Sequence, residues 1–199
     1  MRNKQEELET CAQVQGYDLI VIMETWWDDF CDWSIGTEGY RLFRKDRQGR
    51  QGGGVTLCVN DQLKCMELHL EVDEDLTESL WVRIKGRAGT GEIIVGVCYR
   101  PPNHEDQMDE ALYRQIGAAW HSQALALMGD FIHPNISWKD NTAGHKQSRR
   151  FLESVDGNFL LQVIEEPTRR GAMLDLVLTT KERLVGNVKL KGSFGCSDH

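Results

Sequence analysis

Short apolar segments, each about as long as one β-strand, recur along this chain and limit the folds open to it. They lie at residues 17–23, 54–59, 79–84, 92–98, 124–128 and 174–178, and they are rich in Val, Ile and Leu. Nearly continuous apolar runs of this length are typical of strands buried on both faces. Helical spacing of apolar residues predicts helices at residues 4–14 and 107–120, and a further helix is expected at 148–155.

Many strands with few helices between them argue against a simple alternation of strand and helix. The pattern favours an α/β fold in which two packed mixed sheets are flanked by helices. A chain of 199 residues is the size of one domain, so we assign residues 1–199 to a single unit.

The composition restricts the kind of protein further. The formal net charge is −8, whereas a protein that grips DNA through its overall field should be basic. Nucleic-acid contact would therefore need local basic patches or a bound cation. The six cysteines are scattered without a C-x-x-C pair, which argues against a zinc or disulfide framework. Neither a membrane-spanning run nor a signal-peptide core is present, so we expect no membrane association and no secretion.

Several of the apolar segments run into polar residues that a core would not choose. The residues concerned are Glu24, Tyr99, Asp130 and Asp175, followed by the closing pair Asp198 and His199. Carboxylates that met at strand ends would repel one another, and Mg²⁺, which prefers oxygen ligands, would relieve that repulsion. The alternative for any single residue is an ordinary loop position or helix cap. Asp175 fits that alternative least, because it lies inside the apolar run 173–178, where an unpaired carboxylate is costly to bury.

The order of these residues resembles the exonuclease–endonuclease–phosphatase superfamily, and within it the endonuclease domain of chicken-repeat and jockey-type LINE retrotransposon polyproteins. The resemblance covers nearly the whole chain. It rests on the segments 17–27 (YDLIVIMETWW), 52–55 (GGGV), 78–81 (ESLW), 99–102 (YRPP), 128–131 (MGDF), 133–138 (HPNISW), 174–177 (LDLV) and 197–199 (SDH).

The resemblance implies a four-layer α/β sandwich and a role for each matching residue. Glu24 and Asp198 correspond to acidic residues at a Mg²⁺ or Mn²⁺ ion, and no small-molecule cofactor is implied. Tyr99 corresponds to the tyrosine that contacts the scissile phosphate, and Asp130 to the aspartate that positions or deprotonates the attacking water. His199 corresponds to the histidine that stabilises the transition state, and Asp175 to the aspartate that orients it.

The sequence departs from the pattern of this superfamily in three places. The chain starts after the strand that carries a metal-binding Asn and stops at His199, so the domain is expected to lack its first and last strands. Ile132 stands where the superfamily has Asn, and its apolar side chain cannot make the hydrogen bonds of an amide. The loss of one such preorganised contact costs on the order of 10²–10³ in rate. Asn135 is three residues further on and is not expected to substitute.

By resemblance, the activity is hydrolytic nicking of DNA that primes reverse transcription, with the polymerase domain absent from this chain. Nuclear localisation follows from that role, and cytoplasmic localisation is the alternative. The expected DNA contacts form two basic clusters, namely Arg44, Lys45, Arg47 and Arg50 with Arg41, and Arg169 and Arg170 with Arg149 and Arg150. For each of these residues the alternative is a solvated charged face.

A catalytically inactive remnant of a retroelement is the competing hypothesis for the whole chain. A lipid or inositol phosphatase is a third hypothesis, which segments 78–81 and 133–138 disfavour.

Overall fold

The computed structural model describes residues 10–23, 39–46, 54–86, 91–101, 105–120, 124–133, 135–168 and 172–185. Residues 10–15 are helical. The elements that follow are β1 (Leu19–Met23), β2 (Tyr40–Lys45), β3 (Val55–Asn60), β4 (Lys64–Glu67), the short 3₁₀ helix η1 (Glu74–Leu76), β5 (Glu78–Lys85), β6 (Glu92–Tyr99), α2 (Asp106–Trp120), β7 (Leu125–Asp130), β8 (Ile136–Ser137), β9 (Thr142–Ala143), α3 (Lys146–Gly157), β10 (Leu161–Gln162) and β11 (Asp175–Thr179).

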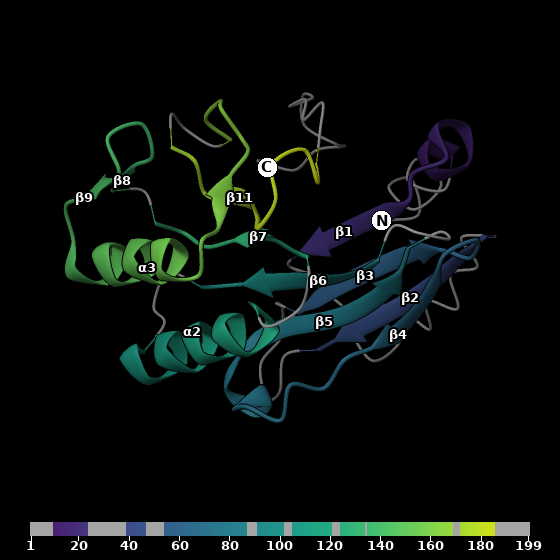
Figure 1. Ribbon diagram of the computed structural model, residues 1–199, viewed down its shortest axis with the longest axis horizontal. Helices are drawn as coiled ribbons and strands as arrows, with labels where there is room; N and C mark the ends of the chain where they lie inside the picture. Colours follow the sequence, from purple (N-terminus) through teal and green to yellow (C-terminus); the bar gives the residue numbers. More distant parts are fainter. Residues whose placement is uncertain are drawn as a thin grey trace.

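These strands form two main sheets and one small hairpin (Figure 1). The three-stranded sheet has the order β1-β3-β2 and is antiparallel throughout. The six-stranded sheet has the order β10-β11-β7-β6-β5-β4, and β6 and β7 are its parallel pair. A parallel pair needs a crossover connection, and α2 supplies it between β6 and β7. The hairpin pairs β8 with β9.

Alternating side chains of the six-stranded sheet build two hydrophobic cores. On one face, Leu80, Val82 and Ile84 of β5 pack with β3 and β6 in a core between the two main sheets. On the other face, Trp81 packs with residues of α2 and α3 in a second core. The helices therefore cover the side of the six-stranded sheet that faces away from the three-stranded sheet.

The predicted fold class is confirmed, and all six predicted strands and the helices at 107–120 and 148–155 are present. The helix predicted at 4–14 is described from residue 10 onward, where it is helical. The sequence did not predict β2, β4 or the two-residue strands β8, β9 and β10. β2 and β4 are edge strands in which polar residues interrupt the apolar ones, so neither contains the continuous apolar run of a strand covered on both faces.

Two further sequence predictions concern cysteines and membranes. Cys58 and Cys98 are buried free thiols, as expected for small core residues, and burial raises the pKa of Cys58 to about 11. Among the described residues, the helices are too short or too polar to cross a bilayer.

Candidate functional site

Strand register brings four polar residues of the six-stranded sheet into one line. Glu78 at the start of β5 pairs with Tyr99 at the end of β6. Tyr99 pairs in turn with Asp130 at the end of β7, and Asp130 pairs with Asp175 at the start of β11. Neighbouring strands are about 4.8 Å apart, so each of these residues lies beside the next. We call Glu78, Tyr99, Asp130 and Asp175 the polar row.

The polar row lies on the face of the sheet that packs against the three-stranded sheet. Side chains alternate between faces along a strand, and Leu80, Val97 and Met128 belong to the core between the sheets. Glu78, Tyr99 and Asp130 each lie two residues from one of them and therefore share their face. Asp130 is only 2% exposed and Tyr99 8% exposed, while Glu78 and Asp175 are half-buried. The apolar core between the sheets thus ends in a line of polar groups.

The three-stranded sheet reaches the polar row at Glu78. The backbone N–H of Gly54 donates a hydrogen bond to Oε2 of Glu78 over 3.2 Å. Gly54 precedes Val55, which pairs with Met23, the last residue of β1. The C-terminal end of β1 therefore lies at the same edge of the molecule as Glu78. Glu24, the predicted metal ligand that follows Met23, lies outside the described residues.

Backbone contacts fix Asp130 at the point where β7 ends. The N–H of Arg100 donates to the carbonyl of Asp130 over 2.8 Å, and the N–H of Phe131 donates to the carbonyl of Leu174 over 3.0 Å. The N–H of Ile132 donates to Oδ1 of Asp130 over 3.3 Å. The chain passes through a φ of 43° at Ile132, in the left-handed region that disfavours β-branched residues. Asp130 is therefore held by its neighbours on both flanking strands and by the turn behind it.

The start of β11 is fixed by a threonine outside the sheet. Thr168 accepts hydrogen bonds at Oγ1 from the N–H groups of Leu174 and Asp175, both over 3.1 Å. Asp175 is thus held at the backbone, and its carboxylate can face Asp130. The sequence predicted that Asp130 and Asp175 belong to one site, and the strand register brings them together.

A buried ion pair supports the polar row from the opposite face of the sheet. Arg100 donates from Nε and Nη2 to the two carboxylate oxygens of Asp109 over 2.7 and 2.8 Å. Both side chains are 3% exposed. Because Asp109 lies in the first turn of α2, the pair ties that helix to the end of β6, directly beside Tyr99. Segment 99–102 pointed to Tyr99, and nothing in the sequence indicated a role for Arg100.

Glu78 is the second residue of this region that the sequence analysis left without a role. It begins the segment 78–81, which carried the resemblance, but by itself it follows no long apolar run. Only its pairing with Tyr99 and its bond from Gly54 place it in the polar row.

The basic residues predicted to contact DNA are partly described. Lys45 ends β2 and pairs with Val55, so it lies at the same end of its sheet as Gly54. Its ammonium group donates to the backbone carbonyl of Glu74, and burial lowers the pKa of Lys45 despite the nearby carboxylates of Glu74 and Asp75. Arg44 is exposed and forms an ion pair with Asp46. Arg47, Arg50, Arg169 and Arg170 lie outside the described residues, as do Asp198 and His199.

The chemistry of the polar row suits a hard divalent cation. Asp130 and Asp175 offer carboxylate oxygens from adjacent strands, and Mg²⁺ usually takes only one or two protein carboxylates. Within the part of the chain that the structure describes, no group of three His, Cys, Asp or Glu side chains forms a metal-binding cluster. The donor types therefore fit the predicted cation, and the two predicted ligands Glu24 and Asp198 belong to segments outside that part.

Residues 2–199 match the Endonuclease/Exonuclease/phosphatase family. The chain belongs to this family. Enzymes of the Endonuclease/Exonuclease/phosphatase family generally depend on a divalent metal, in agreement with the carboxylates at the end of the sheet. The predicted superfamily is thereby confirmed. A sequence comparison with curated proteins gave no match.

Solved structures of other proteins share the fold, among them two endonucleases. The endonuclease domain of TRAS1, a telomere-specific non-LTR retrotransposon, superposes with a TM-score of 0.63 at 19% identity, covering 89% of this chain and 80% of that domain. An AP endonuclease from Archaeoglobus fulgidus gives a TM-score of 0.58 at 16% identity, covering 90% and 82% of the two chains. TDP2 from D. rerio, complexed with a single-strand DNA product, gives 0.61 at 7% identity, covering 89% and 76%. At these identities the likeness concerns the fold.

Proposed function

We propose that this chain is a Mg²⁺-dependent DNA endonuclease of the Endonuclease/Exonuclease/phosphatase family that nicks target DNA for retrotransposition. The observation that carries the proposal is the polar row, in which Tyr99, Asp130 and Asp175 occupy matched positions on three adjacent strands. These are the described residues for which the resemblance implied a direct part in the reaction. A line of acidic and phenolic groups at the end of a hydrophobic core has no stabilising purpose of its own, because burying carboxylates side by side is unfavourable.

The proposed mechanism assigns a separate task to Tyr99, Asp130 and Asp175, three of the four members of the row. Tyr99 directs its hydroxyl at a non-bridging oxygen of the scissile phosphate. Asp130, held by the N–H of Ile132, orients a water for in-line attack and accepts its proton. Asp175 is assigned the task of orienting the imidazole of His199, which would neutralise charge on the phosphate. A Mg²⁺ ion held by Glu24 and Asp198 would add positive charge next to the phosphate and the leaving oxygen.

DNA is the proposed substrate because its phosphates would explain the basic residues at the end of the molecule where the polar row lies. Arg44 is exposed on β2, and Lys45 reaches the same end of the molecule as Gly54 and Glu78. We propose that Arg44, Lys45, Arg47 and Arg50, with Arg169 and Arg170, bind phosphates on both sides of the nick. Phosphate contacts of this kind position a duplex without reading its sequence. The known retrotransposon endonuclease with the same fold supports this choice.

A role in retrotransposition would require access to chromosomal DNA, so we propose nuclear localisation. In this role, the nick would leave a 3′-hydroxyl that primes reverse transcription.

A second candidate function is that of a catalytically inactive relative that retains the fold. Ile132 favours it, because an apolar side chain follows Asp130 where the resemblance implies an amide. Its unfavourable φ of 43° shows that the backbone there has the shape that Asn or Gly adopts more easily.

A plasmid-nicking assay tests the proposal. Supercoiled DNA is incubated with Mg²⁺ and the purified wild-type protein, Asp130→Asn or Asp175→Asn, each of which keeps the size of the side chain. Asp61→Asn is the matched control, because Asp61 is exposed in the turn between β3 and β4. We expect nicking by wild type and Asp61→Asn and a loss of about 10²-fold or more in the other two variants. Equal rates in all four proteins would overturn the proposal.

The variant Ile132→Asn separates the two candidate functions. If the wild-type protein does not nick DNA but the Ile132→Asn variant does so with Mg²⁺, the chain is an impaired endonuclease. Its other site residues are then intact. A wild-type protein and an Ile132→Asn variant that are both inactive support the second candidate.

A further inference from the structure

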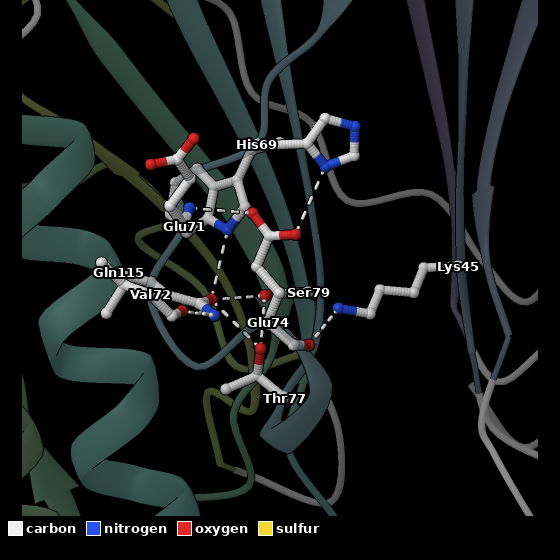
Figure 2. Close-up of polar contacts among 9 residues, drawn as sticks. Lys45, His69, Glu71, Val72, Glu74, Thr77, Ser79 and Gln115 are labelled. Carbon is white, nitrogen blue, oxygen red and sulfur yellow. Dashed lines mark hydrogen bonds and ion pairs between the residues drawn. The ribbon is translucent and has the colours of Figure 1, made fainter.

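A buried glutamine on α2 hydrogen-bonds to both residues that flank Glu78. Gln115 lies in the middle of α2 and has no exposed surface. Its side-chain oxygen accepts hydrogen bonds from Ser79 Oγ over 2.6 Å, Thr77 Oγ1 over 3.1 Å and Trp81 Nε1 over 3.3 Å. Figure 2 shows the amide of Gln115 pointing from the helix toward the hydroxyls of Thr77 and Ser79.

The alternation of side chains along a strand explains why these contacts bear on Glu78. Thr77 and Ser79 face α2, so Glu78 between them faces the opposite side, where the N–H of Gly54 donates to its carboxylate. A hydrogen bond on each flanking residue fixes the twist of the backbone at residue 78. The hydroxyls of Thr77 and Ser79 are also 2.8 Å from each other, so one of them can donate to the other in place of Gln115.

The same amide holds the loop that leads into β5. Nε2 of Gln115 donates to the carbonyl of Val72 over 2.8 Å. Within this loop, the carboxylate of Glu74 accepts hydrogen bonds from the N–H of Glu71 and from Nδ1 of His69, and the carbonyl of Glu74 accepts the ammonium of Lys45 (Figure 2). Gln115 thus bonds to the two residues that flank Glu78 and to the loop whose Glu74 carbonyl accepts Lys45.

A role in packing alone would not select this residue. The neighbouring buried positions of α2 are Ala111, Leu112, Ile116 and Ala119, together with the ion-paired Asp109. An apolar side chain at position 115 would leave the hydroxyls of Thr77 and Ser79, the indole N–H of Trp81 and the carbonyl of Val72 without this buried partner. The amide satisfies these groups and, because hydrogen bonds are directional, also holds them in fixed places.

We infer that Gln115 is a positioning residue, which sets the placement of Glu78 in the polar row from the opposite face of the sheet. The effect of this placement on catalysis rests on the proposed function. The placement itself is a structural property, and it can be measured whether or not the protein cleaves DNA.

Hydrogen exchange at the Gly54 amide reports the placement directly, because that N–H donates to Glu78. Gln115→Met keeps the length of the side chain and removes its hydrogen bonds. We expect it to lower the protection of the Gly54 amide about ten-fold, as loss of a buried hydrogen-bond network should, and the reference variant Glu78→Ala to do the same. Amides of the central pair β6 and β7 should keep their protection. An unchanged Gly54 amide in Gln115→Met would overturn the inference.

The variants Thr77→Val and Ser79→Ala keep the test decisive if Gln115→Met does not fold. Each removes one hydroxyl from the same network and leaves Gln115 in place. We expect each to lower the protection of Gly54 by less than Glu78→Ala does, and the two changes together to approach it. No change in the double variant would refute the inference.

A kinetic cycle tests the consequence for catalysis. If Gln115 acts through Glu78, Gln115→Met should lower kcat for plasmid nicking about ten-fold in the wild-type background with little change in KM, and no further in the Glu78→Ala background. A fall of the same size in both backgrounds would show a general structural effect and contradict the inference. If the wild-type protein does not nick DNA, the proposed function fails, while the exchange measurement still decides the placement of Glu78.

Discussion

Ile132 has a backbone φ of 43°, which a β-branched residue adopts only at a cost. The left-handed conformation costs an L-residue roughly 1–2 kcal/mol, and Asn tolerates it best among residues with a side chain. We therefore expect Ile132→Asn to raise the free energy of unfolding by about 1 kcal/mol, as measured by urea denaturation. Ile132→Val keeps the β-branch and should bring no gain. A variant Ile132→Asn that is less stable than wild type would show that burial of the isoleucine outweighs its backbone strain.

Gly129 allows β7 to approach β6 just before Asp130. A Cβ atom at this position would lie 2.0 Å from the carbonyl oxygen of Cys98, which belongs to the backbone and cannot give way cheaply. We expect Gly129→Ala to destabilise the fold by about 3 kcal/mol and to displace Asp130. Gly117 in α2 is the matched control, because its nearest atom would be 3.8 Å away. Gly117→Ala should stabilise the helix by up to about 1 kcal/mol, and thermal melts of both variants would check the contrast.

The anchoring of α2 to β6 depends on the bidentate pair of Arg100 and Asp109. Removal of one partner leaves an uncompensated charge in the core, so Asp109→Asn and Arg100→Met should each cost about 3–5 kcal/mol. The combination of Arg100→Met with Asp109→Leu should recover much of that loss, since neither charge is then buried. A double-mutant cycle by chemical denaturation measures this coupling. Strictly additive losses would mean that the pair does not act as a unit.

The loop before β5 should contribute less to stability in acid. Burial tends to raise the pKa of Glu74, but its hydrogen bonds from the Glu71 and Leu70 backbone and from His69 outweigh this effect and lower that pKa below 4.5. A lowered carboxyl pKa contributes stability at pH values above 4.5, and this contribution is lost as the pH falls through the folded-state value. Between pH 6 and 3, Glu74→Gln should therefore show a shallower fall of stability than wild type. Parallel curves would contradict the role of Glu74.

The edge strands β2 and β4 are elements that sequence reasoning did not find. β2 has the sequence YRLFRK and β4 has KCME, and neither contains a continuous apolar run. Each pairs on one side only, so part of its surface remains available to polar side chains. β2 forms by pairing with β3, and β4 forms by pairing with β5. The residues of β2 and β4 alone do not show where these partner strands lie.

At the scale of the whole molecule, the net charge of −8 disfavours the binding of DNA. Binding should therefore depend on a few exposed Arg and Lys side chains and on Mg²⁺. Each phosphate neutralised contributes roughly 0.9 to the slope of log K against log salt concentration, so Arg44→Ala should reduce that slope by about 1. Arg114→Ala is the control, because Arg114 is exposed on α2, on the far side of the six-stranded sheet. Fluorescence anisotropy with a labelled duplex measures both slopes. Equal slopes for Arg44→Ala and wild type would remove Arg44 from the DNA contacts.

The sequence by itself determined the fold class, the strands that form the centre of the two sheets, and the identities of Tyr99, Asp130 and Asp175 as residues out of place in a core. It could do so because burial on both faces demands continuous apolar runs, and a polar residue that interrupts or ends such a run is conspicuous. Each of these signals lies within a few consecutive residues.

Only the tertiary structure decided that Glu78 completes the row and that Gln115 holds it. Glu78 meets Tyr99 through the register of β5 against β6, and Gln115 reaches Thr77 and Ser79 across separations of 38 and 36 residues. Pairing register and helix docking are set by the packing of the whole core, since a shift of one residue would turn every side chain of a strand to the other face. No local pattern in the chain carries that information.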